Sequence, residues 1–317
     1  MTINELKDAI RLCIEGNRNV NVETYLVLKN GEIKKANILE GLQPEIQKMF
    51  VDVLQEKILN PENSLLTVSS ADERTGAIYQ YDLEITDSLQ VFNQVLIGIN
   101  EFPTFSFRND GVNSIDAFLF VIGNAEYQMA IYKRLASVNV YQKRNGLFIR
   151  EEDNQFAKLN SDVVKIIPQI DAFMINGEIF VMDLKLLETA FQIHEVIKTA
   201  ARQQIDLLAS YDLVENIDSL EIELENITFA RKFSKLVTNS PVLGRVDNQR
   251  IINFTKNHPA LRNKFRYTGN DTKLELHTKL SKKLFVKLLN DDYLTSTLTN
   301  QDYDSIAKDK VIVVEEE

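Results

Sequence analysis

Three residues in one short stretch have the types and spacing of a metal-dependent nuclease core. Asp171 precedes an apolar run, and Asp183 and Lys185 follow the next apolar run two residues apart. Carboxylates are the ligands that a hard divalent cation prefers, and a lysine beside them could orient the attacking water. The stretch therefore raises the hypothesis of a nuclease of the PD-(D/E)xK type that uses Asp171, Asp183 and Lys185.

The elements that must position these residues argue against a shared metal. The Asn-Gly pair between the two runs is typical of a two-residue hairpin turn. In that register Asp171 faces Met182 and Asp183 faces Ile170, so the two carboxylates lie on opposite faces of the hairpin. A bulge or a longer loop would bring them together again. The alternative hypothesis is a buried hairpin whose Asp183 caps a helix that begins near Leu184.

The hydrophobic pattern of the whole chain predicts an α+β fold. Alternating apolar runs separated by Asn-Gly pairs dominate the first part, and apolar spacings of three and four dominate from Leu186 onward. We therefore expect a β-hairpin-rich N-terminal domain with flanking helices, residues 1–187, followed by a mainly helical basic domain, residues 188–317. Helices are expected at 3–14, 44–59, 88–99, 248–256 and 279–289, with a long amphipathic stretch at 186–208.

The composition of the 317 residues excludes several classes of protein. The only cysteine is Cys13, which excludes an intrachain disulfide and a cysteine-based zinc site. Glu5 and Asp8 stand where a signal peptide needs a basic start, and the longest apolar run is too short to span a bilayer. The three histidines have no metal-ligand spacing, and no phosphate-binding loop or nucleophile elbow occurs. We expect a cytoplasmic protein with no cofactor and no metal site.

The charge is divided unevenly along the chain. The formal net charge is −10, yet residues 229–289 hold fourteen basic residues and three acids, a net charge of +11 that leaves −21 for the rest. Residues 206–225 hold seven acids and no base. The basic segment could pair with the protein's own acidic surface, bind the phosphates of nucleic acid, or contact an anionic membrane surface.

The nucleic-acid hypothesis assigns a phosphate contact to each of nine basic side chains. Phosphate contacts position a protein on DNA without reading its sequence. Lys279, Lys283 and Lys287 recur at a spacing of four on the expected helix 279–289, where like charges destabilise an isolated helix. An anionic ligand would offset that repulsion. The nine expected DNA contacts are Arg231, Lys232, Lys235, Arg262, Lys264, Arg266, Lys282, Lys283 and Lys287.

The C-terminal sequence LFVKLLNDDYLTSTLTNQDYDSIAK, residues 284–308, resembles a known family. Its Leu-Leu-Asn-Asp-Asp-Tyr-Leu block at 288–294, the later Tyr303 and the Leu-Glu-Thr-Ala-Phe segment at 187–191 are similar to the KwaB-like family of the Kiwa anti-phage system. By its own chemistry, the Asp pair of the block is expected to cap a short helix at 293–298.

The resemblance implies a soluble, homodimeric effector that binds double-stranded DNA. It also implies a small multi-span membrane partner resembling KwaA, which would recruit the protein to the inner membrane and block phage DNA replication. The family is not defined by a catalytic motif, so no catalytic residue is carried over and a non-enzymatic role is favoured. The metal-dependent nuclease and a partner-docking subunit that does not bind DNA remain the alternatives.

Overall fold

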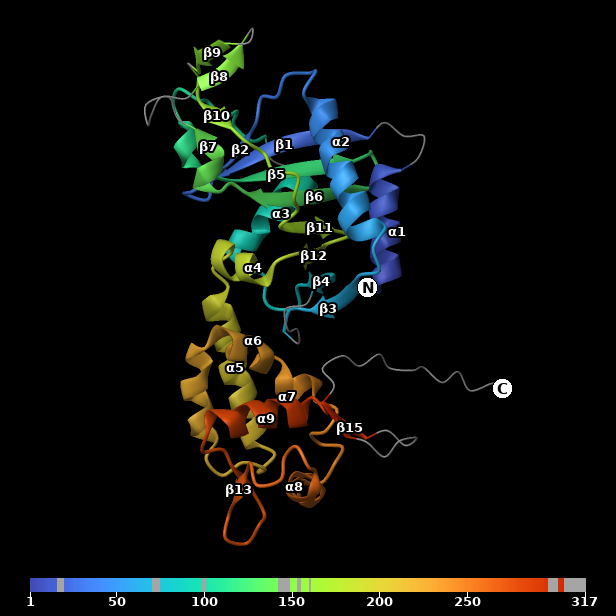
Figure 1. The fold of residues 1–317 in the computed structure, drawn as a ribbon, viewed down its shortest axis with the longest axis vertical. Helices are drawn as coiled ribbons and strands as arrows, with labels where there is room; N and C mark the ends of the chain where they lie inside the picture. Colours follow the sequence, from blue (N-terminus) through green and yellow to red (C-terminus); the bar gives the residue numbers. More distant parts are fainter. Residues whose placement is uncertain are drawn as a thin grey trace, which may run out of the picture. The chain divides into compact units, whose positions relative to one another are not determined.

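The computed structural model describes residues 1–15, 20–69, 75–98, 101–141, 149–152, 155–159, 161–295 and 302–304. Its internal contacts divide the chain into two compact units, the N-terminal unit Met1–Ile193 and the C-terminal unit His194–Glu317. Strands dominate the first unit and helices the second (Figure 1). The expected α+β fold is therefore confirmed, while the domain boundary after residue 187 stays a prediction.

An eight-stranded sheet organises the N-terminal unit, in the order β2-β1-β5-β6-β11-β12-β4-β3. Its neighbouring strands are antiparallel except β3 and β4, which run parallel. Two small sheets pair β7 with β10 and β8 with β9. The strands are β1 (Asn21–Leu28), β2 (Ile33–Lys35), β3 (Ser64–Thr67), β4 (Ala77–Gln80), β5 (Ile115–Gly123), β6 (Gln128–Arg134), β7 (Val140–Tyr141), β8 (Ile149–Glu152), β9 (Gln155–Lys158), β10 (Val163–Val164), β11 (Ala172–Ile175) and β12 (Glu178–Val181).

Helices cover both faces of this sheet, which explains why its central strands are apolar almost throughout. Residues of α1 and α2 share one core with Phe120, Ile131 and Phe173. Tyr132 points to the other face, where its ring lies 6.1 Å from that of Phe92 in α3. The helices of this unit are α1 (Ile3–Ile14), α2 (Gln43–Leu54), which continues as a π-helical turn (Gln55–Leu59), α3 (Gln90–Ile97) and α4 (Leu184–Ala190). Short 3₁₀ turns occupy Asp87–Leu89, Val112–Ser114 and Ser137–Asn139.

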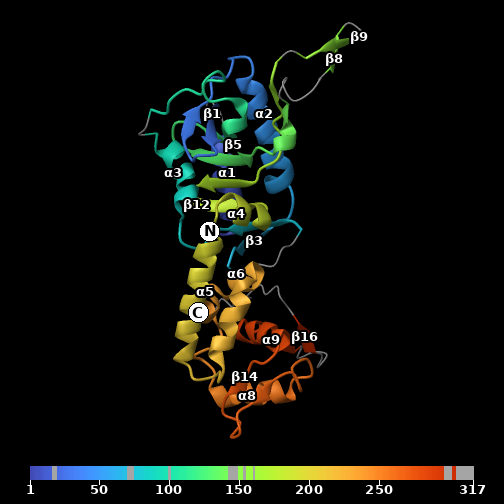
Figure 2. The ribbon, with the colours of Figure 1, turned by 90° about the vertical axis from the view of Figure 1, so that its left-hand side faces the viewer.

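The C-terminal unit is built around α5, which packs against a 3₁₀ helix, α6 and α7, while α9 contacts α6 and α7. Figure 2 shows α8 and the hairpin of β13 and β14 at one end of this unit. Its helices are α5 (His194–Ala209), the 3₁₀ helix Ile217–Glu225, α6 (Ile227–Phe233), α7 (Leu236–Asn239), α8 (Asn248–Asn257) and α9 (Lys279–Leu289). Its strands are β13 (Arg266–Tyr267), β14 (Leu274–Glu275), β15 (Tyr293–Thr295) and β16 (Asp302–Asp304).

Two local expectations are corrected by the backbone. The amphipathic stretch 186–208 is not continuous, because Gln192 adopts a left-handed φ of 51° between α4 and α5. The helix expected at 293–298 is wrong for its described part, since residues 293–295 form β15 after Asp291 turns the chain with a φ of 57°. Residues 296–298, the other half of that expectation, lie outside the described residues. Both departures occur where a single residue with a positive φ changes the direction of the chain. The spacing of apolar residues does not indicate such a position.

Candidate nucleic-acid interface

Asp171 is bound inside the N-terminal unit and faces a lysine. Its Oδ1 lies 2.8 Å from Lys133 Nζ, and its Oδ2 accepts a hydrogen bond of 2.7 Å from the backbone N–H of Arg134. Both side chains of the Lys133–Asp171 pair are nearly buried, at 11% and 12% exposed. Burial of a charge requires such a partner, because an isolated one is strongly destabilising. Both carboxylate oxygens of Asp171 therefore already have bonding partners within the N-terminal unit.

Asp183 has a different set of partners, as the hairpin register predicts. The β11–β12 pairing places Phe173 opposite Phe180, and Met182 N donates to Asp171 O, so the turn holds only two residues. Asp183 Oδ1 accepts hydrogen bonds from the backbone of Lys185 and Leu186 at 2.8 and 3.1 Å. The prediction that Asp183 caps the following helix is confirmed.

The structure thus gives Asp171, Asp183 and Lys185 no common centre. Lys185 is exposed in the first turn of α4, and Asp171 precedes β11 on the strand opposite. Within the described part of the chain, no three His, Cys, Asp or Glu side chains gather as a metal site would require. Asp171 and Asp183 each have a partner within the N-terminal unit, and the assignment of Asp171, Asp183 and Lys185 to a nuclease stays a prediction.

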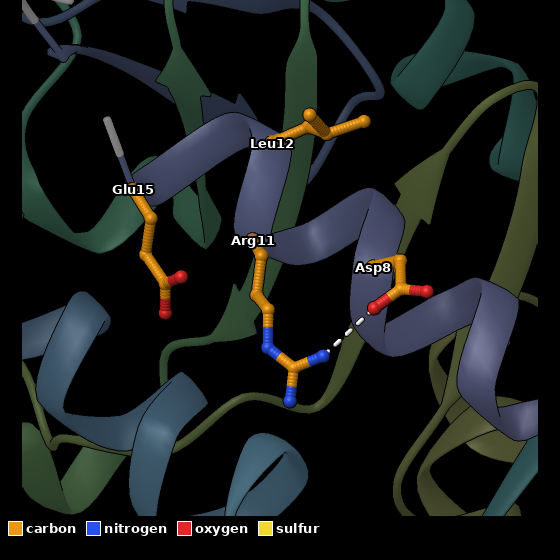
Figure 3. Close-up of a pocket in the computed structure, with 4 residues that line it drawn as sticks. All are labelled: Asp8, Arg11, Leu12 and Glu15. Carbon is orange, nitrogen blue, oxygen red and sulfur yellow. Dashed lines mark hydrogen bonds and ion pairs between the residues drawn. The ribbon is translucent and has the colours of Figure 1, made fainter. Parts of the chain in front are cut away.

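A surface hollow on α1 offers little chemistry. It is lined by Asp8, Arg11 and Leu12 of α1 and by Glu15, the residue that follows the helix, and Arg11 Nη1 forms an ion pair of 2.7 Å with Asp8 Oδ1 (Figure 3). On the buried side of the same helix, burial raises the pKa of the Cys13 thiol to about 12. A thiol with that pKa stays protonated at neutral pH and is a poor nucleophile.

A group of exposed basic residues lies in the C-terminal unit after α8, and we call Arg262, Lys264 and Arg266 the loop group. Leu261 and Phe265 are buried at 0% and 6% exposed and alternate with these exposed side chains. Backbone hydrogen bonds from the N–H groups of residues 261 and 262 to the His258 carbonyl hold the turn. The apolar anchors therefore fix the loop and direct its basic side chains outward.

Helix α9 carries two neighbouring lysines with opposite environments. Lys282 is buried, donates a hydrogen bond of 2.6 Å from Nζ to the Ser219 carbonyl, and lies 3.3 Å from Glu223 Oε1. Lys283 is exposed and has no ion pair with a carboxylate among the described residues, whereas Lys287 is half-buried. The helix therefore exposes Lys283, leaves Lys287 half-buried and uses Lys282 internally.

Helix α6 and its end hold the remaining three expected contacts. Arg231 is only 3% exposed, while Lys232 and Lys235 are half-buried. Helix α6 packs against α9, so these residues and the α9 lysines belong to neighbouring elements. We call Lys232, Lys235, Lys283 and Lys287 the helix group. The structure thus separates the nine expected contacts into two groups and two buried residues, Arg231 and Lys282.

Part of the basic segment does pair with the protein's own acids. Lys273 Nζ lies 2.8 Å from Asp212 Oδ1 and 3.1 Å from Glu215 Oε2, and these hydrogen bonds raise its pKa. Lys256 pairs similarly with Asp271 at 2.8 Å. This internal pairing accounts for Lys256, Lys273 and Lys282, and it does not extend to the loop group or Lys283 within the described residues.

Three exposed basic residues were not among the nine expected contacts. Arg245, Arg250 and Lys279 are exposed, and none forms an ion pair with a carboxylate in the described ranges. Lys279 lies one turn before Lys283 on α9, so its spacing of four in the sequence already indicated that the two lysines share a helix face. Arg245 and Arg250 flank the start of α8 and had no such signal.

The chain matches the family model described as "Kiwa protein KwaB-like" over residues 112–299. It is also similar to Kiwa protein KwaB of Escherichia coli O55:H7 (strain RM12579 / EPEC), with 29% identity over 317 residues, 98% of this chain and 99% of that protein. No solved structure matches. Over the residues that the structure covers, no helix has the length and apolarity to cross a membrane. Because the family model spans more than half of the sequence, the chain belongs to the KwaB-like family of Kiwa proteins, and this membership supports a role in anti-phage defence.

Proposed function

We propose that this protein is an anti-phage effector that binds double-stranded DNA through phosphate contacts, largely independently of base sequence. One observation carries the proposal: Arg262, Lys264, Arg266 and Lys283 are exposed and have no carboxylate partner among the described residues. Uncompensated basic side chains on fixed supports bind polyanions, because each phosphate contact releases condensed counterions. The net charge of −10 does not oppose this, since the local charge near a site governs binding.

The proposed contacts are the loop group and the helix group. Lys232, Lys235 and Lys287 are half-buried and each already makes an interaction within the protein, so a phosphate would compete with that interaction. Arg231 and Lys282 are left out, because they are buried in the described structure. A phosphate contact from Lys282 would require loss of its bonds to Ser219 and Glu223.

The cellular part of the proposal rests on similarity to Kiwa protein KwaB. The protein acts as a cytoplasmic homodimer that a small multi-span membrane partner resembling KwaA recruits to the inner membrane, where DNA binding blocks phage replication. Fractionation of cells that express the protein with and without a membrane protein resembling KwaA tests recruitment. Protein that stays in the soluble fraction in both cases contradicts it.

The DNA-binding proposal is tested with a triple charge reversal of the loop group. Binding of a fluorescent 30-base-pair duplex is followed by anisotropy at about 100 mM salt. Arg262→Glu, Lys264→Glu and Arg266→Glu together should weaken affinity about a hundredfold, because three phosphate contacts are lost. The effect should be equal for duplexes of unrelated sequence, since these contacts do not read bases.

The control is a charge-matched triple variant in the N-terminal unit. Lys29, Lys48 and Lys57 are exposed, and reversal of all three to Glu changes the net charge by the same amount. This variant should keep wild-type affinity within about twofold, because the proposal assigns no phosphate contact to these three lysines. Equal losses in both triples would mean that total charge, not the loop group, governs binding. Complex formation with an acidic protein and none with DNA would support the partner-docking alternative.

A further inference from the structure

Helix α8 has a buried apolar face and an exposed face of unusual composition. Ile251, Ile252 and Thr255 are buried at 2%, 0% and 0% exposed and pack the helix onto the C-terminal unit. At 100° per residue the exposed side chains form one continuous arc on the opposite side. These exposed residues are Gln249, Arg250, Asn253, Phe254 and Asn257. The exposed arc, which we call the α8 face, contains three amides, one arginine and one aromatic ring and no acid.

These side-chain types are the ones that recognise base edges in the DNA major groove. Arginine forms two hydrogen bonds with the O6 and N7 atoms of guanine, and asparagine or glutamine forms two with the N6 and N7 atoms of adenine. An aromatic ring can contact the methyl group of thymine. A solvated helix face is usually rich in lysine and glutamate, which give soluble helices their i,i+4 pairs. The α8 face instead carries amide and guanidinium groups, which are planar and form hydrogen bonds.

Some side chains of the α8 face form hydrogen bonds with one another, and others have donors without a partner among the described residues. Gln249 Nε2 donates to Asn253 Oδ1 at 3.3 Å, and Asn257 Nδ2 donates to the Asn253 carbonyl at 2.8 Å. These bonds align the three amides along one line of the helix. The Arg250 guanidinium and the Asn253 amide nitrogen have no partner within the described part of the chain. Donors that could reach a base edge are thus available at the centre of the face.

Basic residues flank the α8 face on both sides in sequence. Arg245 precedes the helix, and the loop group follows it, all exposed and without carboxylate partners in the described ranges. Both views place α8 beside the β13–β14 hairpin at one end of the C-terminal unit (Figures 1 and 2). The ten residues of α8 span about 15 Å, and the major groove is roughly 12 Å wide and accepts an α-helix. The charge distribution is complementary to a groove bordered by phosphates.

We infer that α8 enters the major groove of duplex DNA and that Arg250 and Asn253 read base edges there, a specificity-determining role that rests on the proposed function. The loop group holds the phosphates beside the groove and supplies most of the affinity. Arg250 and Asn253 add a preference among sequences that all bind. This assigns base discrimination to a helix face that combines three amides with an arginine that has no partner among the residues that the structure describes.

The inference is tested by selection from a pool of duplexes with a random 20-base-pair core. Bound and input DNA are sequenced, and the salt dependence of binding to the whole pool is measured in parallel. Wild-type protein should enrich a guanine and an adenine at two fixed positions by about tenfold each, the discrimination of a good two-bond contact. Asn253→Ala should abolish the adenine enrichment and leave the salt dependence unchanged, because no charge is removed.

A second variant and a control separate reading from folding. Arg250→Lys keeps the charge but loses the planar fork, so the guanine enrichment should disappear while the salt dependence persists. Asn239→Ala removes an exposed asparagine from the end of α7 and should leave both enrichments intact.

The results distinguish the two levels of the proposal. Salt-dependent binding without any enrichment by wild-type protein overturns the role of α8 and leaves phosphate binding standing. Absence of binding overturns both. Enrichment that is lost equally in Asn253→Ala and Asn239→Ala also contradicts the inference, because a general effect on the unit would then explain it.

Discussion

The hairpin that contains Asp171 and the basic segment of the C-terminal unit use charge in opposite ways. In the hairpin region, Asp171 is held by Lys133 and Arg134 N, and Asp183 caps α4. In the C-terminal unit, Arg262, Lys264 and Arg266 lie on the loop after α8 and at the start of β13, beside buried apolar neighbours, and have no carboxylate partner among the described residues. In the hairpin region the charged side chains are bonded within the protein. In the C-terminal unit the three basic side chains remain available to a ligand.

The same contrast occurs between adjacent residues of α9. Lys282 recurs with Phe285, Val286 and Leu289 at spacings of three, four and seven, so it lies on the apolar face and is buried. Lys283 lies one residue later and is exposed. A count of positive charge in a segment therefore overstates what is available for binding. The burial of each lysine and its pairing with acids decide whether it is available to bind a ligand.

The largest expected effect follows from removal of Asp171. Asp171→Ala leaves the Lys133 ammonium buried without its carboxylate and removes the acceptor of the Arg134 N–H. Loss of one member of a buried pair costs about 3–5 kcal/mol of unfolding free energy. Urea denaturation followed by circular dichroism measures this loss.

An exposed pair gives the matched control for Asp171. Asp52→Ala breaks the i,i+4 pair with Lys48 on α2, which is 78% and 56% exposed, and should cost under about 0.5 kcal/mol. If Asp171→Ala is as mild as Asp52→Ala, the carboxylate is not structural, and the hairpin regains its interest as a site.

The next effect separates the two neighbouring lysines of α9. Lys282→Met removes the donor to Ser219 O and Glu223 Oε1, so unfolding free energy should fall by about 2 kcal/mol with little change in DNA binding. Lys283→Met should leave stability unchanged and reduce the magnitude of the slope of log affinity against log salt by about 1. Chemical denaturation and anisotropy on both proteins provide the comparison.

An inverted outcome for this pair would contradict the account of α9. If Lys282→Met weakens DNA binding in a folded protein while Lys283→Met does not, the buried lysine must reach the phosphates. The C-terminal unit would then have to rearrange on binding.

The smallest expected effect concerns the helix cap at Asp183. Asp183→Ala removes the acceptor for the N–H groups of Lys185 and Leu186 and should lower unfolding free energy by about 1 kcal/mol. Asp183→Asn should recover most of that loss, because asparagine is an equally good cap. Plasmid cleavage in Mg²⁺ that the wild type performs and Asp183→Asn lacks would show that the carboxylate acts on a metal instead.

Local chemistry carried much of the fold prediction. The Asn-Gly turn fixed the register of β11 and β12, and apolar spacing located α1, α8 and α9 close to their observed bounds. The partner of Asp171 could not be predicted, because Lys133 is 38 residues away and meets it only through the pairing of β6 with β11. The spacing of Lys282 indicated its burial, but the groups that compensate its positive charge on an apolar face, the Ser219 carbonyl and Glu223, are about 60 residues away and could not be predicted.

The central claim is that open charges of the C-terminal unit bind DNA phosphates, and the most direct test is the salt dependence of duplex binding by the wild-type protein. If about six phosphates are neutralised, affinity should fall roughly a thousandfold between 50 and 200 mM salt, with a log–log slope of about −5. An affinity that does not change with salt, or no binding at 50 mM salt, would contradict the claim.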